Sequence, residues 1–117
     1  MAGTFAGETV VVVSAETMGR GDDVLGAKLL GNFLRTVCTL EVKPDAMVFY
    51  NGAVRLLAPD SPHLEALRAL EEAGVDLLAC VTCLEFFSLA QPLAVGTVSN
   101  MREIAKRTLG ASKVVTV

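Results

Sequence analysis

Two cysteines three positions apart, Cys80 and Cys83, are the side chains of this 117-residue chain most able to do chemistry. They follow the largely apolar run 75–79, which is typical of a buried strand, so the first thiol should lie where a strand gives way to a helix. The partial positive charge of a helix start stabilises a thiolate, the reactive form in sulfur exchange. This placement predicts a reactive pair with an accessible sulfur at Cys80. The alternative is that both cysteines are small buried hydrophobic residues.

A zinc site is the other chemistry that a CxxC spacing suggests. A structural zinc ion needs four nitrogen or sulfur ligands, and the chain has no second CxxC and a single histidine, His63. We therefore expect no metal. His63 is expected at the surface in the first turn of a helix, and Cys38 is expected to pack in the core on the apolar stripe of another helix.

The glycine-rich loop 18–23 follows the first strand, as a phosphate-binding loop would. It lacks the Gly-Lys-Ser/Thr ending of a Walker loop, Val24 stands where a dinucleotide loop needs glycine, and Asp22 and Asp23 would repel a pyrophosphate. We expect no nucleotide and no other cofactor. The loop is interpreted as a flexible turn that brings Arg20 near the thiols, where its charge favours thiolate and attracts an anionic sulfur donor. The alternative is a solvated arginine in a tight loop.

Two further segments are candidates for the same site. Asn51 follows the strand 46–50 and is predicted to hydrogen-bond a substrate or a thiol, although Asn51-Gly52 is equally a turn signal. Phe86 and Phe87 lie just after the thiols and are expected to contact another subunit. The alternative is that one ring is core and the other is exposed.

The elements that must position these residues alternate between strand and helix. The expected strands are 8–14, 46–50, 75–80, 93–98 and 113–117, and the expected helices are about 21–39, 62–73, a short one from Cys83, and 101–109. Ser61, Ser99 and Thr82 are expected to be helix caps, Thr82 in a capping box with Glu85.

This alternation predicts an α/β fold: a three-layer α/β/α sandwich with a five-stranded, mostly parallel sheet. Ligands of such sheets bind outside the carboxyl ends of the strands. The segments 15–21, 51–53, 80–83 and 99–100 leave those ends. We expect them to meet in one shallow site.

Length and composition narrow the class of protein. We expect residues 1–7 to be a flexible leader and residues 8–117 to be a single domain. With 10 basic and 13 acidic residues, one Tyr and no Trp, we expect no nucleic-acid partner, and no apolar run approaches the roughly 20 residues that cross a membrane. Three cysteines suit reduced thiols and a cytoplasmic location. The 52% hydrophobic content predicts a sheet covered on both faces or contact between subunits.

Several segments together resemble a known family. They are 18–23 with 25–26, then 49–52, then 80–84, and finally 95–96 followed by 100–101. In that order and spacing the chain resembles the DsrE-like sulfur-relay family, most closely the C-terminal domain of YedF-type proteins associated with selenium metabolism. The resemblance covers almost the whole chain after the leader.

The resemblance implies a homo-oligomer, trimeric or hexameric, that passes sulfane sulfur as a persulfide on a cysteine after a central strand. Cys80 matches that cysteine, and Cys83 corresponds to the second thiol of the YedF-type motif. YedF-type proteins usually carry a TusA-like domain before this one. Here only a short leader precedes the first strand, so a reaction that needs a TusA-like carrier would recruit it from another chain.

Three functional hypotheses remain at this stage. The leading one is a sulfurtransferase or sulfur carrier in which Cys80 accepts sulfur and Cys83 releases it by closing a disulfide. The second is a CxxC dithiol/disulfide redox protein, although no Trp or Pro flanks the thiols as in thioredoxin-like sites. The third is a non-catalytic oligomeric binding module in which the cysteines only pack.

Overall fold

A five-stranded sheet lies at the centre of the computed structural model, which describes residues 7–89 and 93–117. Its strands are β1 (Thr9–Val13), β2 (Ala46–Phe49), β3 (Asp76–Cys80), β4 (Thr97–Ser99) and β5 (Lys113–Thr116). They run in the order β4-β3-β2-β1-β5 and every pair is parallel, which confirms the predicted sheet. Residues 1–6 of the expected leader lie outside the described residues, and Gly7 is in a turn.

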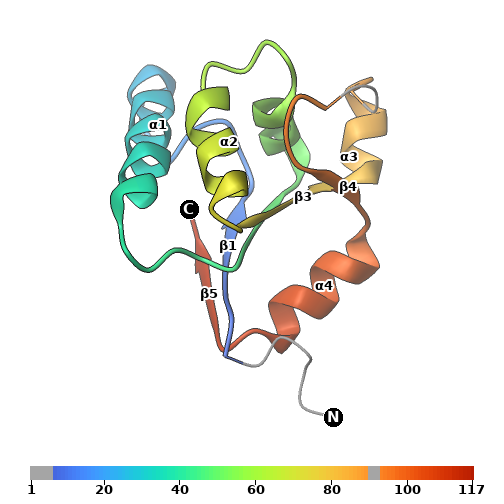
Figure 1. The fold of residues 1–117 in the computed structure, drawn as a ribbon. Coiled ribbons are helices and arrows are strands. Elements are labelled where there is room, and N and C mark those ends of the chain that lie inside the picture. Colours follow the sequence, from blue (N-terminus) through green and yellow to red (C-terminus); the bar gives the residue numbers. More distant parts are fainter. Residues whose placement is uncertain (1–6, 90–92) are drawn as a thin grey trace.

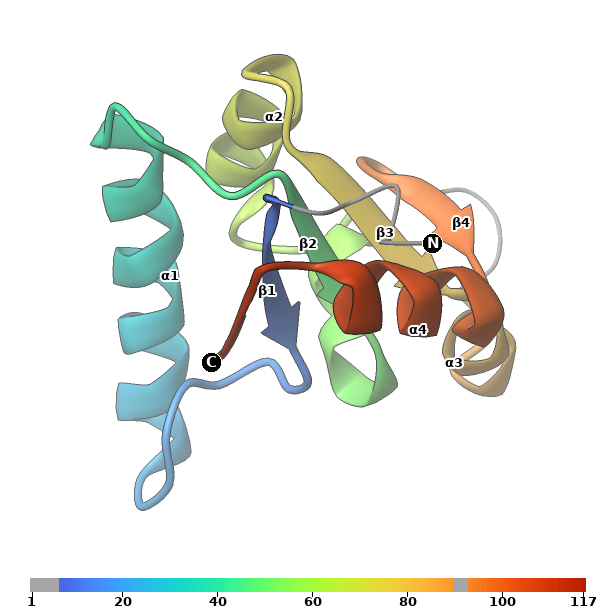
Figure 2. The ribbon, with the colours of Figure 1, turned by 90° about the horizontal axis from the view of Figure 1, so that it is seen from below.

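Within residues 7–89 and 93–117, four α-helices and one 3₁₀ helix connect the strands (Figure 1). They are α1 (Asp23–Thr39), η1 (Asn51–Leu57), α2 (Leu64–Glu72), α3 (Val81–Phe86) and α4 (Met101–Gly110). Helices α1 and α2 cover one face of the sheet and α4 lies across the other, which gives the predicted three layers (Figure 2). Among the described residues, no helix is both long and apolar enough to cross a membrane.

The core has two parts because the central strands are apolar on both faces. The larger cluster lies between the sheet and α1 and α2, and it includes Val11, Val13 and Phe49. The smaller one, here called the α4-side cluster, contains Val10, Val12, Ala46, Val48, Cys80 and Ile104. Alternate residues of β1 therefore enter different layers, as the two-residue period of a strand requires.

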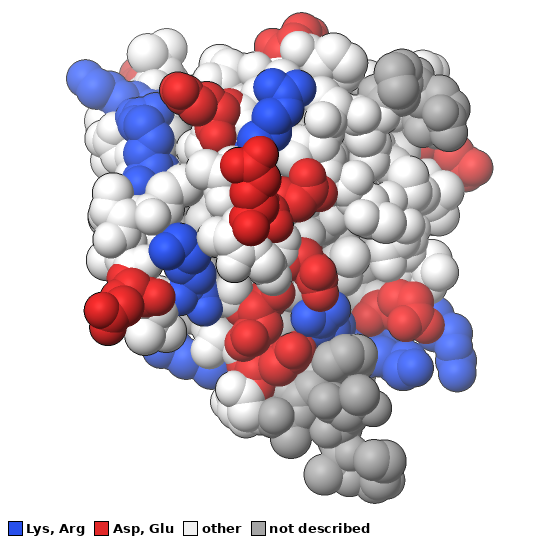
Figure 3. Space-filling view, viewed as in Figure 1, with Lys and Arg blue, Asp and Glu red and all other residues white. Residues whose placement is uncertain are grey.

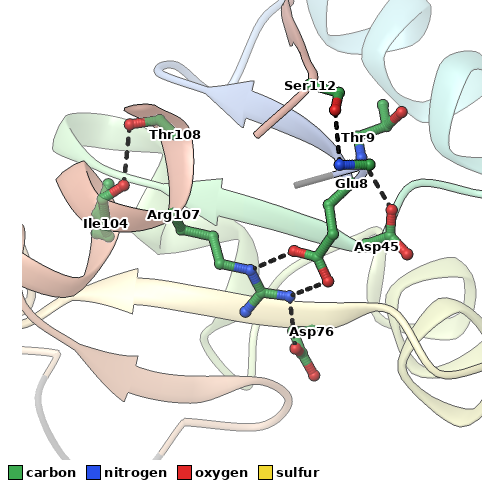
Figure 4. Close-up of polar contacts among 9 residues, drawn as sticks. Glu8, Thr9, Asp45, Asp76, Ile104, Arg107, Thr108 and Ser112 are labelled. Atoms are coloured by element: carbon green, nitrogen blue, oxygen red, sulfur yellow. Dashed lines mark hydrogen bonds and ion pairs between the residues drawn. The ribbon is translucent and has the colours of Figure 1, made fainter. Parts of the chain in front are cut away.

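Basic and acidic side chains adjoin at the lower edge of the molecule in Figure 3, and charged side chains tie the amino ends of the strands together (Figure 4). Arg107 on α4 donates to Glu8 Oε1 at 2.9 Å and to Asp76 Oδ2 at 3.0 Å, which joins the start of β1 to the start of β3. The Asp45 carboxylate accepts the Thr9 N–H at 2.8 Å. These contacts fix α4 and the first residues of the sheet at the end opposite the thiols.

The expected helix starts at Pro62 and Cys83 differ from the observed ones. Helix α2 begins at Leu64, and Ser61 Oγ accepts the His63 N–H at 3.2 Å in the turn before it. Helix α3 begins at Val81, because β3 pairs with β4 up to its last residue, Cys80, and the chain turns into the helix at once. The expected capping box is therefore wrong, since Thr82 lies inside the first turn.

Two further differences concern the segments around β2 and β4. The 3₁₀ helix η1 was not anticipated, because Asn-Gly in the sequence indicates only a turn. Strand β4 is confined to Thr97–Ser99, since Gly96 has φ +85° and breaks the extended backbone before it. Helix α4 is capped by Asn100, whose side chain accepts the Glu103 N–H at 2.9 Å, and not by Ser99.

Candidate functional site

The candidate site lies where β2 and β3 end. These strands are neighbours in the sheet, and both continue directly into short helices, β2 into η1 and β3 into α3. In Figure 1 both short helices lie at the upper end of the sheet, beyond the carboxyl ends of the strands. The topology thus brings together Asn51 and Cys83, which are 32 residues apart in the sequence.

Cys83 is the thiol that faces an opening. It lines a cavity of about 350 Å³ together with Asn51, Thr82, Phe86 and Phe87. Its Sγ accepts the backbone N–H of Asn51 at 3.0 Å, and its side chain packs against both core clusters. It therefore sits at the boundary between the interior and the cavity.

Cys80 is buried, with only 2% of its surface exposed, so the expectation of an accessible sulfur there is wrong. The physical reason is the alternation of β3. Leu77 and Ala79 face the larger cluster, whereas Leu78 and Cys80 face α4, where Cys80 packs in the α4-side cluster with Ile104. Cys80 lies behind Cys83 as seen from the cavity, and it is absent from the cavity lining.

The two thiols touch each other and both are free. Burial raises the pKa of the Cys83 thiol, the Asn51 backbone N–H opposes this rise, and the hydrogen bond and charge interaction with Cys80 add to it. The result is a pKa above the ordinary value. The sequence predicted the opposite tendency from the helix start, but α3 has only 6 residues and its effect does not offset burial.

Arg20 is not brought to the thiols. It is exposed and lines a different cavity, at the carboxyl end of β1, with Ser14, Thr17 and Asp23 among its neighbours. None of the described residues lines both this cavity and that of Cys83. The expected site therefore separates into two, and Asn51 joins the thiols without Arg20.

A different arginine flanks the thiol cavity. The Arg55 guanidinium on η1 lies 4.2 Å from the centre of the Phe87 ring, which lines the cavity. Arg55 also pairs with Glu16, its Nη1 lying 3.3 Å from Oε2. Sequence reasoning missed this residue, although Arg55 is the single charged position between 49 and 59 and follows a strand by only a few residues.

The two phenylalanines after the thiols form an edge-to-face pair with ring centres 5.1 Å apart. Phe87 is partly buried and packs against the larger cluster, whereas 81% of Phe86 is exposed. Within the chain this matches the alternative in which one ring packs inside and the other faces out. The contact with another subunit stays a prediction.

The remaining sequence candidates lie elsewhere. His63 is partly buried and lines a separate cavity with Cys38 and Arg35, and burial, together with the nearby charge of Arg35, lowers the pKa of His63. Cys38 packs against the larger cluster, as expected, and donates to the Ala66 carbonyl at 3.4 Å. Among the described residues, no group of three or more His, Cys, Asp or Glu is arranged to hold a metal ion.

Comparisons with solved structures agree on the fold. The chain is similar to the YchN protein from E. coli (TM-score 0.67, 20% identity, covering 95% of this chain and 99% of that chain). It is also similar to MTH1491 from Methanobacterium thermoautotrophicum, a protein of unknown function (TM-score 0.66, 22% identity, covering 97% of this chain and 99% of that chain). A third similar structure is BT1422 from Bacteroides thetaiotaomicron, described as a conserved protein of unknown function. Its TM-score is 0.58 at 14% sequence identity, and the match covers 94% of this chain and 95% of that chain.

At these identities the likeness shows the architecture alone. No curated protein matches the chain. The model of the DsrE/DsrF-like family, in contrast, matches residues 10–117, which include both thiols and all five strands except Thr9, the first residue of β1. The chain therefore belongs to the DsrE/DsrF-like family.

Proposed function

We propose that this protein is a sulfur carrier or sulfurtransferase that takes sulfane sulfur as a persulfide on the Cys80/Cys83 pair. The observation that carries the proposal is the arrangement of the thiols: one lines a cavity at the carboxyl edge of a parallel sheet and touches a second thiol directly behind it. Membership of a family associated with sulfur relay supports the same chemistry. The three cysteines are free, as a carrier in the reducing cytoplasm requires.

Cys83 is the entry thiol in this proposal, because Cys80 is only 2% exposed. The Cys83 thiolate attacks the terminal sulfur of a donor R–S–SH, the donor's S–S bond breaks, and R–S⁻ leaves and takes up a proton. One S–S bond forms as another breaks, so there is no net oxidation. Cys80 then takes the terminal sulfur from Cys83 by the same exchange. The family position of the persulfide, Cys80, is thereby kept as the storage position.

The cavity favours an uncharged or apolar donor group. None of the described residues that line it is charged, and two of them are phenylalanines. The nearby cation, Arg55, is held against the Phe87 ring and paired with Glu16. A persulfide borne by an apolar or peptide carrier suits these surroundings better than a small sulfur oxyanion does.

Partners follow from the same site. We propose a homo-oligomer, trimeric or hexameric, and a TusA-like carrier protein that acts from a separate chain. The exposed Phe86 ring beside the thiol cavity supports contact with another protein surface at this place. Size and mass of the assembled protein, measured in solution by light scattering, test the oligomer.

The direct test is intact-mass analysis after treatment with a sulfane-sulfur donor. Wild-type protein should gain one sulfur atom, and Cys83→Ser should gain it far more slowly. Cys80→Ser should carry sulfur only on Cys83, from which a small reductant removes it quickly. Cys38→Ser is the matched control, since Cys38 lies in another cavity, and it should load as the wild type does. Equal loading of the Cys80/Cys83 double variant would defeat the proposal.

A dithiol/disulfide redox protein is the second candidate, and the contact between the two thiols is the observation that favours it. Oxidation would join Cys80 Sγ to Cys83 Sγ and release two electrons and two protons to a disulfide substrate. This candidate is tested by measuring the reduction potential of the Cys80/Cys83 pair and the disulfide reductase activity of the protein. Reductase turnover without sulfur loading would select this candidate over the first.

A further inference from the structure

The turn after β2 has an unusual backbone conformation at Asn51. Its φ is +53°, in the left-handed region. Residues other than glycine rarely adopt this conformation, and asparagine is among those that tolerate it best. The neighbouring Gly52 could adopt this conformation at no steric cost, yet it is not the residue with positive φ. Left-handed residues of this kind gather at functional sites, where the surrounding structure holds them.

The conformation has a definite geometric result. The chain leaves β2 with the Tyr50 N–H bonded to the Val13 carbonyl at 3.3 Å, and it resumes the 3₁₀ helix with the Ala53 N–H bonded to the Tyr50 carbonyl at 3.2 Å. Between these two backbone bonds, the Asn51 N–H turns toward α3 and meets Cys83 Sγ at 3.0 Å. The amide therefore has a sulfur atom, and not a carbonyl, as its acceptor.

We propose that the backbone amide of Asn51 is the donor that stabilises negative charge on Cys83, and that the left-handed turn exists to aim it. The inference deepens the proposed function and rests on it, since charge appears on Cys83 when its thiol is activated and again when its persulfide passes the sulfur on. An N–H donates weakly to a neutral thiol and strongly to a thiolate, so the contact stabilises the reactive form more than the resting one.

The surroundings of Cys83 give this amide its importance. Burial and the adjacent Cys80 both favour the neutral thiol, and the cavity-lining residues that the structure describes carry no charge that would counter them. The amide is a fixed dipole that needs no reorganisation when the charge forms. The role that the sequence suggested for the Asn51 side chain thus passes to its backbone, and the side chain serves to make the left-handed turn tolerable.

The test separates the backbone from the side chain at position 51. Asn51→Gly keeps the N–H and adopts positive φ freely, whereas Asn51→Ala keeps the N–H but disfavours the turn. Iodoacetamide labelling of Cys83, followed by peptide mass against pH, gives the rate and the midpoint of thiol ionisation. We expect Asn51→Gly to match the wild type within about twofold. Asn51→Ala should react about fivefold more slowly at neutral pH, with its midpoint moved upward.

Equal slowing in the Gly and Ala variants would assign the effect to the side chain and overturn the proposal, as would an unchanged midpoint in Asn51→Ala. Should Asn51→Ala fail to fold, NMR on wild-type protein decides. The chemical shift of the Asn51 amide proton should move downfield with the same pH midpoint as Cys83 ionisation. A chemical shift that does not change with that ionisation would refute the contact. Labelling needs no sulfur donor, so a confirmed amide effect without sulfur loading would refute the proposed function alone.

Discussion

The two ends of the parallel sheet are built from different chemistry. At the amino end, Arg107 is 13% exposed and bridges Glu8 and Asp76 in a charged network (Figure 4). At the carboxyl end, a neutral amide meets a neutral thiol beside an open cavity whose described lining residues are uncharged. Both ends join segments far apart in the sequence, but only one of them leaves a reactive atom facing outward.

The pKa values show the same division. Burial alone lowers the pKa of Arg107, but its hydrogen bonds and charge attraction with Glu8 and Asp76 raise it above its ordinary value, so the charged form is matched by its partners. At Cys83, burial raises the pKa and a single backbone N–H opposes it. The amino end is therefore satisfied in its resting state. At the carboxyl end, the surroundings as a whole favour the neutral Cys83 thiol, and the Asn51 N–H is the contact that strengthens when charge develops on its sulfur.

The largest expected effect is on chemistry at the carboxyl end. Replacing both thiols, Cys80→Ser with Cys83→Ser, should abolish sulfur loading because no acceptor remains beside the cavity. The free energy of unfolding in urea should fall by about 1–3 kcal/mol at most, the cost of burying the hydroxyl of serine at position 80 among apolar side chains. A double variant that unfolds much more easily would show that the pair is structural, contrary to the division between the two ends.

Arg107→Met is the reciprocal change at the amino end. It should lower the free energy of unfolding by about 2 kcal/mol, because Glu8 would lose its partner while Asp76 is exposed enough for water to replace the bond. The rate of Cys83 alkylation should stay the same. Chemical denaturation measures the first and peptide-resolved labelling the second. Slower alkylation of Cys83 in this variant would mean that the two ends of the sheet are coupled.

The choice of donor sharpens the description of the cavity. Cys83 should take sulfur from a persulfide R–S–SH whose R group is aromatic and uncharged, such as benzyl persulfide, about tenfold faster than from thiosulfate of equal concentration, because the described walls offer apolar contacts and no cation. Phe87→Leu should reduce this preference by removing the aromatic surface. Stopped-flow loading followed by mass analysis gives both rates. Faster loading from thiosulfate, lost in Arg55→Gln, would reassign the cavity to anions.

The smallest expected effect is the pH dependence of stability. The pKa of Cys83 is raised in the folded state, so its contribution is fully present below the unfolded pKa of about 9.0 and is lost as pH rises through the folded pKa. The urea midpoint should fall slightly above pH 9, and Cys83→Ser should remove that part of the fall. Cys38→Ser is the control. An identical decline in Cys83→Ser would place its cause elsewhere.

The sequence was sufficient for the layers but not for the orientation of the thiols. Strand positions and the parallel sheet follow from apolar runs that alternate with helical periods. However, Leu77, Leu78 and Ala79 are all apolar, so no alternation in β3 reveals which face each residue takes. Only the packed structure shows that Cys80 points toward α4 and that Cys83 is left at the opening.

The loops were harder to predict for a related reason. The glycine-rich segment and its Arg20 looked suited to the site, but β1 ends two strands away from β3, with β2 between them. Asn51 was identified as a turn residue near the thiols, and the sequence could not tell whether its side chain or its backbone would make the contact. Loop conformation depends on the tertiary contacts of each end, and these are not encoded in local propensity.

The burial of Cys80 against Ile104 has a consequence for cargo lifetime. A sulfur atom held there would be shielded by the α4 layer from bulky reductants such as glutathione, which can approach only as far as the neighbouring thiol at the mouth. Delivery would then depend on a recipient that engages Cys83. Such a protein would retain the bound sulfur among other cellular thiols and release it only through Cys83, the residue through which it entered.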